Sequence, residues 1–173
     1  MTNMPNLNLD AEALYRQLAE SVKAGLGDAD NVAIVGIYSG GAWLAERLAT
    51  ELNLEGQGRL GFIDVSFYRD DYAEKGLHAE VKPTQIPFEV EGATILLVDD
   101  VLYTGRTTRA AINELFDYGR PARIRLAALV DRGGRELPIA ADFVAQTVTL
   151  TSDQQLVLGR DDDGRFSLTV DHA

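Results

Sequence analysis

One apolar run that ends in two adjacent aspartates constrains the fold of this chain most. Residues 95–98 read ILLV, and such a run is typical of a strand buried on both faces of a parallel sheet. Asp99 and Asp100 follow it directly. In an open α/β sheet the carboxyl ends of the strands face the ligand crevice, so two carboxylates there can bind neighbouring hydroxyl groups or hold a metal ion.

A short loop of small and polar residues comes next. Residues 104–108 read TGRTT and precede a helical pattern of apolar residues at Ala110, Ala111, Leu115 and Phe116. The free N–H groups of a helix start, close approach at a glycine and threonine hydroxyls together form a monophosphate cradle. The sequence therefore indicates a ribose 5′-phosphate ligand. For the aspartate pair taken alone, a solvated turn with helix-capping residues is an equal alternative.

Length and composition narrow the class of protein. A chain of 173 residues fits one domain, here expected to span 1–173. No apolar run reaches membrane-spanning length and the start MTNMPNLNLD lacks signal-peptide features, so we expect a cytoplasmic protein without membrane partners. Because there is no cysteine, the site must use oxygen and nitrogen groups, which suit Mg²⁺ better than zinc. The net charge of −11 opposes nucleic-acid binding.

Strand and helix patterns alternate along the chain and predict a parallel βαβ core. Helices are expected over 9–26, with Asp10 as N-cap, from about 42 to 52, and from about 108 to the Gly119–Pro121 stop. Strands are expected at 31–37, 60–68, 95–98, 123–130 and 143–150, and as a hairpin of 155–158 and 166–170 around Asp163-Gly164. The polar segment after 68 is interpreted as a mobile arm near the site, or alternatively as a surface loop without a role.

Several motifs occur in the order found in one known family. The segment ILLVDDVLYTGRT at 95–107 resembles the phosphoribosyl diphosphate (PRPP) signature of type I phosphoribosyltransferases. Its form, together with FYRDD at 67–71, GRP at 119–121 and LVDRGGRELPIAAD at 129–142, is most similar to the PyrR family of pyrimidine operon regulators, which also act as uracil phosphoribosyltransferases. The resemblance implies an α/β type I phosphoribosyltransferase fold: a mostly parallel central sheet flanked by helices, a small hood from the terminal segments and a flexible β-arm at about 69–86.

The resemblance also implies roles for individual residues. Asp99 and Asp100 would bind the ribose hydroxyls, Arg69 the pyrophosphate of PRPP, and Val130 and Arg132 would border the uracil pocket. The implied PRPP- and phosphate-binding residues are Ser39, Gly40, Gly41, Val101, Leu102, Tyr103, Thr104, Gly105, Arg106 and Thr107. The implied metal residues, for Mg²⁺ bound with PRPP, are Asp99, Asp100 and Asp131. Plainer alternatives exist: Arg69 could only pair with neighbouring aspartates, and Asp131-Arg132-Gly133 could only be a turn.

The implied reaction joins uracil to PRPP, forms uridine monophosphate (UMP) and releases pyrophosphate. Oxocarbenium character at the anomeric carbon calls for charge neutralisation and positioning more than for a protein nucleophile. Purine transferases with this signature carry an acid at the place of Tyr103, so Tyr103 favours uracil over a purine.

This chain departs from the family pattern after its first strand. Members with transferase activity usually show threonine-arginine-glycine there, whereas this chain has Ser39-Gly40-Gly41. Loss of the arginine contact to pyrophosphate would cost about 1.5 to 3 kcal/mol, or roughly ten- to a hundredfold in binding. The alternative function is therefore a weak or inactive sensor of uridine nucleotides.

A second departure concerns RNA. The positions of the RNA-binding face correspond to Ala19, Lys23, Gly134, Ala140 and Ser152, and only Lys23 and the neighbouring Arg135 keep positive charge. Together with the net negative charge of the chain, this loss of basic residues disfavours transcription attenuation by direct binding to messenger RNA. The resemblance further suggests a homo-oligomer, a dimer or a higher assembly.

Overall fold

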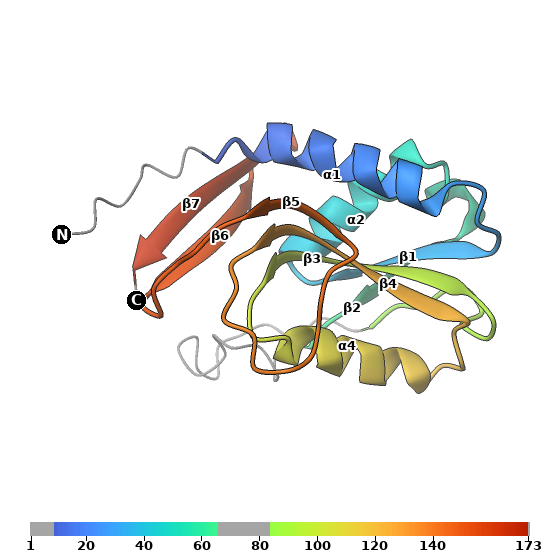
Figure 1. The fold of residues 1–173 in the computed structure, drawn as a ribbon. Coiled ribbons are helices and arrows are strands. Elements are labelled where there is room, and N and C mark those ends of the chain that lie inside the picture. The colour runs from blue at the N-terminus through green and yellow to red at the C-terminus, as the bar shows by residue number, and fades with distance from the viewer. Residues whose placement is uncertain (1–8, 66–83, 173) are drawn as a thin grey trace.

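A five-stranded parallel sheet forms the centre of the molecule (Figure 1). The computed structural model describes residues 9–65 and 84–172. The strands of the sheet lie in the order β2-β1-β3-β4-β5, and their bounds are β1 Val32–Ile37, β2 Leu60–Ile63, β3 Thr94–Leu102, β4 Arg123–Asp131 and β5 Phe143–Thr147. An antiparallel hairpin follows, made of β6 Gln154–Arg160 and β7 Phe166–His172. The helices are α1 Ala11–Leu26, α2 Gly40–Glu51, α4 Arg106–Phe116 and the single-turn η1 Glu55–Gln57.

Helices cover both faces of the sheet (Figure 1): α1 and α2 lie on one face and α4 on the other. Side chains of β3 alternate between the two apolar cores. Leu96 and Val98 pack in the core with α1 and α2, whereas Ile95 and Leu97 pack in the core with α4. Burial on both faces is why this strand is continuously apolar, and the predicted central strand and fold class are confirmed.

Local signals in the sequence account for most element ends. Asp10 is the N-cap of α1, where its Oδ1 accepts a hydrogen bond from Ala13 N at 3.1 Å, as predicted. The hairpin at Asp163-Gly164 is confirmed as well. Several boundaries were wrong: β2 ends at Ile63 and β5 at Thr147, β3 extends to Leu102, and α4 ends at Phe116, before the predicted stop.

The expected arm at 69–86 lies almost wholly outside the described residues, and so does Arg69. The hood expected from the terminal segments stays a prediction. None of the helices in the described part of the chain is long and apolar enough to cross a membrane.

The β6–β7 hairpin is fastened to α1 and α2 by one carboxylate and one guanidinium. Glu12 on α1 accepts from Phe166 N at 2.7 Å and from Arg47 Nη1 at 2.8 Å. Arg47 on α2 also donates to Gly164 O, and its guanidinium carbon lies 3.8 Å from the centre of the Phe166 ring. Burial acts to raise the pKa of Glu12, but these donors outweigh it and hold the pKa below its ordinary value of 4.5.

We expect this contact to make stability depend on pH. Because the pKa of Glu12 is lower in the folded chain than in the unfolded one, its stabilisation is complete above pH 4.5 and is lost as pH falls through the folded value. Urea unfolding followed from neutral to acidic pH should show a smaller loss of stability for Glu12→Gln than for the wild type. Glu20→Gln, on the exposed side of α1, is the control, and equal losses for Glu12→Gln and wild type would contradict the assignment.

Candidate functional site

The candidate site lies where β1, β3 and β4 reach their carboxyl ends. These strands are neighbours, and their register pairs Gly36 with Val98 and Leu102 with Asp131. The turn at 38–41, the loop at 103–105 and the turn at 131–137 therefore start from one edge of the sheet, as expected for an α/β crevice.

The two aspartates belong to β3 itself, which continues to Leu102. Asp99 is 4% exposed, and its Oδ1 accepts from Asp100 N at 2.8 Å, while Asp100 Oδ1 accepts from Val101 N at 2.8 Å. Because side chains alternate along a strand, the two carboxylates point to opposite faces of the sheet. Asp99 borders a small cavity beside α4, and Asp100 lies against the first turn of α2.

The segment 103–105, which leads into α4, is named the phosphate loop here after the binding that the sequence predicts for it. Gly105 is the N-cap residue of α4 with φ 96°, and Thr104 is buried, with its Oγ1 accepting from Arg106 N at 3.2 Å. The first N–H groups of a helix have no partner within the helix and attract anions. A cavity of about 20 Å³ adjoins this helix start and is lined by Asp99, Val101, Leu102, Tyr103, Gly105, Thr107 and Thr108.

For three further residues assigned to phosphate binding, Val101, Leu102 and Arg106, the role stays a prediction. Val101 and Leu102 belong to β3, and the Leu102 side chain is buried in the apolar core, so only its backbone is left for a ligand. Arg106 is exposed, and its Nη2 lies 3.0 Å from Glu136 Oε1. The strand extends beyond the ILLV run because Asp99, Val101 and Leu102 continue to pair with β4.

The Ser39-Gly40-Gly41 turn begins α2 very close to β3, and the peptide bond between Tyr38 and Ser39 is cis. A Cβ atom added at Gly40 would lie within 3.0 Å of the Asp100 side chain. A Cβ atom at Gly41 would lie within 3.0 Å of Val98 O and Asp99 Cα. Glycine is therefore required at Gly41 by close approach of the helix start to the strand backbone, whereas a side chain at Gly40 would require the Asp100 side chain to move.

Gly40→Ala is expected to push the Asp100 carboxylate out of its place, because the two groups would overlap. We expect weaker PRPP binding, measured by calorimetry with Mg²⁺. Adding Gly40→Ala to Asp100→Asn should cause little further loss, since both changes act on one carboxylate. Additive losses in the double variant would show that Gly40 acts independently of Asp100.

The residues expected beside the nucleobase lie at the end of β4. Val130 is fully buried in the apolar core, and its place beside the nucleobase stays a prediction. Arg132 is 7% exposed and donates to Gln154 O at 2.7 Å and to Thr151 O at 2.9 Å. Its guanidinium carbon lies 3.8 Å from the centre of the Tyr103 ring.

Asp131 is engaged within its own turn. Its Oδ2 lies 2.6 Å from Arg135 Nη2, and its Oδ1 accepts from Gly133 N at 2.9 Å. Burial acts to raise the pKa of Asp131, but these two partners lower it below the ordinary value. Within 9–65 and 84–172 no group of three acidic, histidine or cysteine side chains could hold a metal ion, so Asp99, Asp100 and Asp131 do not form a metal site by themselves.

Sequence reasoning named Gly134 and Arg135 only in connection with RNA and missed their contacts in this region. Gly134 packs against Tyr103 so closely that an added Cβ atom would lie within 3.0 Å of the ring. Arg135 donates to the backbone oxygens of Ile139 and Tyr103 and to the Asp131 carboxylate. The four-residue spacing from Asp131 to Arg135 was the one sequence signal of their ion pair.

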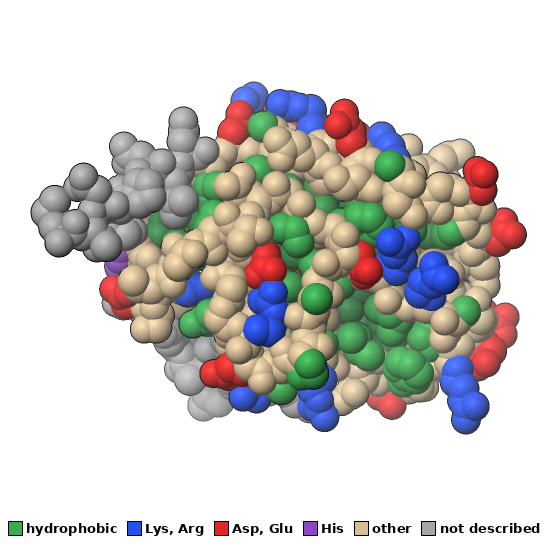
Figure 2. All heavy atoms as spheres, in the orientation of Figure 1, with side chains coloured by type: hydrophobic (Ala, Val, Ile, Leu, Met, Phe, Trp, Pro, Cys, Tyr) green, Lys and Arg blue, Asp and Glu red, His purple; other side chains and the backbone are tan. Residues whose placement is uncertain are grey.

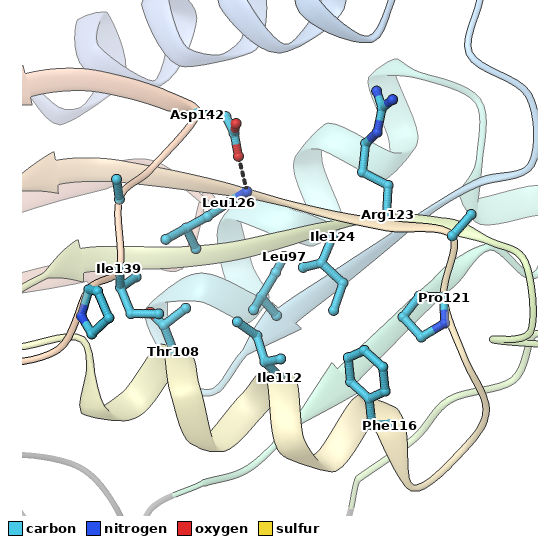
Figure 3. A pocket seen from close by; sticks show the side chains of 13 residues that line it. Leu97, Thr108, Ile112, Phe116, Pro121, Arg123, Ile124, Leu126, Ile139 and Asp142 are labelled. Carbon is cyan, nitrogen blue, oxygen red and sulfur yellow. Dashed lines mark hydrogen bonds between the residues drawn. The ribbon is translucent and has the colours of Figure 1, made fainter.

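A larger apolar hollow of about 410 Å³ lies between α4 and β4 (Figure 3). Ile112 and Phe116 on α4 point towards β4, whereas Arg123 points away from the hollow. Figure 2 shows hydrophobic side chains gathered on this face, and Phe116 is 52% exposed.

Solved structures confirm the fold. A purine phosphoribosyltransferase from Pyrococcus horikoshii superposes with a TM-score of 0.58 at 25% identity, covering 80% of this chain and 83% of that one. A hypoxanthine phosphoribosyltransferase from Trypanosoma cruzi gives a TM-score of 0.57 at 22% identity, covering 81% and 79%.

Sequence comparison defines the family. Residues 3–157 match the phosphoribosyl transferase domain. The bifunctional protein PyrR of Ralstonia nicotianae is 52% identical over 171 residues, covering 96% of this chain and 97% of the relative. The bifunctional protein PyrR of Nitrosococcus oceani is 46% identical over 169 residues, covering 96% of both chains. Because the domain match and these relatives cover nearly the whole sequence, the chain belongs to the PyrR family of phosphoribosyltransferase-domain proteins.

Proposed function

We propose that this protein is a uracil phosphoribosyltransferase and a pyrimidine-responsive regulator, which converts uracil and PRPP to UMP and pyrophosphate in the cytoplasm. One observation carries the proposal: Asp99, Asp100 and the α4 start stand together at the carboxyl end of the sheet. Membership in the PyrR family supports the choice of a pyrimidine base.

The chain's own groups act by binding and orientation. The α4 start receives the 5′-phosphate, and the carboxylates of Asp99 and Asp100 receive the ribose hydroxyls from the two faces of β3. The first turn of α2 offers N–H groups to the departing pyrophosphate. Holding both reactants at one edge removes most of the entropy cost of their encounter.

Mg²⁺ is part of the proposal as an ion that arrives with PRPP. The described residues hold no three-ligand cluster, which fits a cation that keeps phosphate and water oxygens as its main ligands. Asp99 and Asp100 are the carboxylates placed to approach it. When bound, the ion neutralises charge that develops on the leaving pyrophosphate.

The test measures UMP formation from uracil and PRPP with Mg²⁺, and hypoxanthine serves as a control base. We expect turnover with uracil and none with hypoxanthine. Absence of UMP formation at saturating substrate concentrations would refute the proposed uracil phosphoribosyltransferase activity.

A second candidate function is a sensor of uridine nucleotides with little or no turnover. It is favoured by the Ser39-Gly40-Gly41 turn, which offers no cationic side chain to pyrophosphate. Calorimetry with UMP distinguishes the two functions. UMP binding without turnover supports the sensor function, and failure to bind UMP excludes it.

Attenuation by direct RNA binding is disfavoured. Of the positions that matter for RNA in the family, Ala19 is buried, and the neighbouring Arg135 directs its donors into the protein. Filter binding with a pyrimidine-operon leader RNA should show no salt-sensitive retention, with or without UMP.

Self-association is also part of the proposal, through the apolar hollow between α4 and β4. Its volume and the exposed Phe116 suit a second copy of the chain. Sedimentation should show a smaller species for Ile112→Glu than for the wild type. Asn113→Glu places the same charge on the exposed side of α4 and should leave the assembly intact.

A further inference from the structure

Arg135 lies where three backbone segments meet behind the phosphate loop. Its Nε donates to Ile139 O at 2.7 Å, and its Nη1 donates to Tyr103 O at 2.7 Å. Its Nη2 pairs with Asp131 Oδ2 at 2.6 Å. The side chain is 25% exposed, so these bonds are partly shielded from water. One guanidinium thus joins the end of β4, the phosphate loop and the segment before β5.

The same turn holds the next peptide of the phosphate loop. Glu136 N and Leu137 N donate to Thr104 O at 2.9 Å and 3.0 Å. Two successive carbonyl groups of the loop, those of Tyr103 and Thr104, therefore point towards the turn at 131–137. The Tyr103 ring is held as well, by Arg132 on one side and by Gly134.

Fixing these carbonyl groups also fixes the N–H groups that follow them. A trans peptide is planar, so its N–H points opposite to its C=O. With Tyr103 O directed at Arg135 and Thr104 O directed at residues 136 and 137, the N–H groups of Thr104 and Gly105 are directed away from the turn. The Gly105 N–H stands at the N-cap of α4, where an anion is favoured.

We propose that Arg135 is a positioning residue for phosphate binding, which acts by holding the Tyr103 carbonyl and so orienting the donors of the phosphate loop. This role rests on the proposed function of the site. Arginine suits it because the planar fork reaches three acceptors in fixed directions. A lysine would keep the charge beside Asp131 but could not span all three acceptors.

The experiment compares wild type, Arg135→Met and Arg135→Lys. The hydrogen-exchange rates of the amides at 104–106 measure how well the phosphate loop is ordered in the absence of a ligand. Calorimetry with PRPP and Mg²⁺ measures the affinity for PRPP. Arg109→Met is the control, because it removes the same charge from an exposed position on α4. Urea unfolding of each variant separates loop effects from global stability.

We expect Arg135→Met to exchange these amides about tenfold faster and to bind PRPP about tenfold more weakly, as loss of a charge-assisted hydrogen bond implies. Arg135→Lys should fold with its Asp131 contact kept and show an intermediate effect on both readouts. The control Arg109→Met should match the wild type in both amide exchange rate and PRPP affinity.

Unchanged amide exchange and unchanged PRPP affinity in both Arg135 variants would overturn the proposal, and so would an exchange increase spread evenly over the whole chain. If the wild type itself does not bind PRPP, the proposed function fails. Loop exchange then still decides whether Arg135 orders the loop.

Discussion

Gly41→Ala should both destabilise the protein and abolish tight PRPP binding. The added Cβ would lie within 3.0 Å of Val98 O and Asp99 Cα, which are backbone atoms of the central strand. Because backbone atoms cannot rotate away, the added methyl group would force α2 and β3 apart. Overpacking of this kind lowers the free energy of unfolding by about 1 to 3 kcal/mol. The same shift would displace Asp100 and the α2 start from each other. Urea unfolding and calorimetry with PRPP measure the two effects.

Gly56→Ala is the matched control for this change. Gly56 lies in η1, and a Cβ atom there would meet nothing within 4 Å. Its unfolding midpoint and PRPP affinity should equal those of the wild type. If Gly41→Ala behaved like this control, the close approach of α2 to β3 would not be essential.

Asp100→Asn should weaken PRPP binding with little loss of stability. The asparagine keeps the shape of the side chain, and its amide oxygen can still accept from Val101 N. What it loses is the negative charge that strengthens hydrogen bonds to the ribose hydroxyls. We expect a loss of about 1.5 to 3 kcal/mol, roughly ten- to a hundredfold in affinity.

Calorimetry with PRPP and Mg²⁺ measures that loss, with Asp117→Asn as the control. Asp117 is the exposed C-cap of α4, so its substitution makes the same charge change outside the site. Asp100→Asn with wild-type affinity would mean that Asp99, or neither aspartate, binds the ribose. A large fall in its unfolding midpoint would instead show that the charge holds the strand end together.

The sequence by itself determined the parallel core, the glycine-containing loop before α4 and the family. These features depend on contiguous residues: an apolar run is buried on both faces, a glycine before a helix leaves N–H groups open, and Asp10 caps the helix that follows it. The hairpin at Asp163-Gly164 is local in the same sense. Short-range chemistry decides such elements before any distant contact forms.

Only the tertiary structure decided which way the site residues face. The register of β3 against β4 extended the strand to Leu102, buried Val130, and set Asp99 and Asp100 on opposite faces. The need for glycine at Gly41 follows from packing of α2 against β3. The inward direction of Arg135 depends on acceptors at Tyr103 and Ile139, and Tyr103 is far from it in sequence. A side chain's partners across a fold are fixed by packing and pairing geometry, which no local pattern of residues encodes.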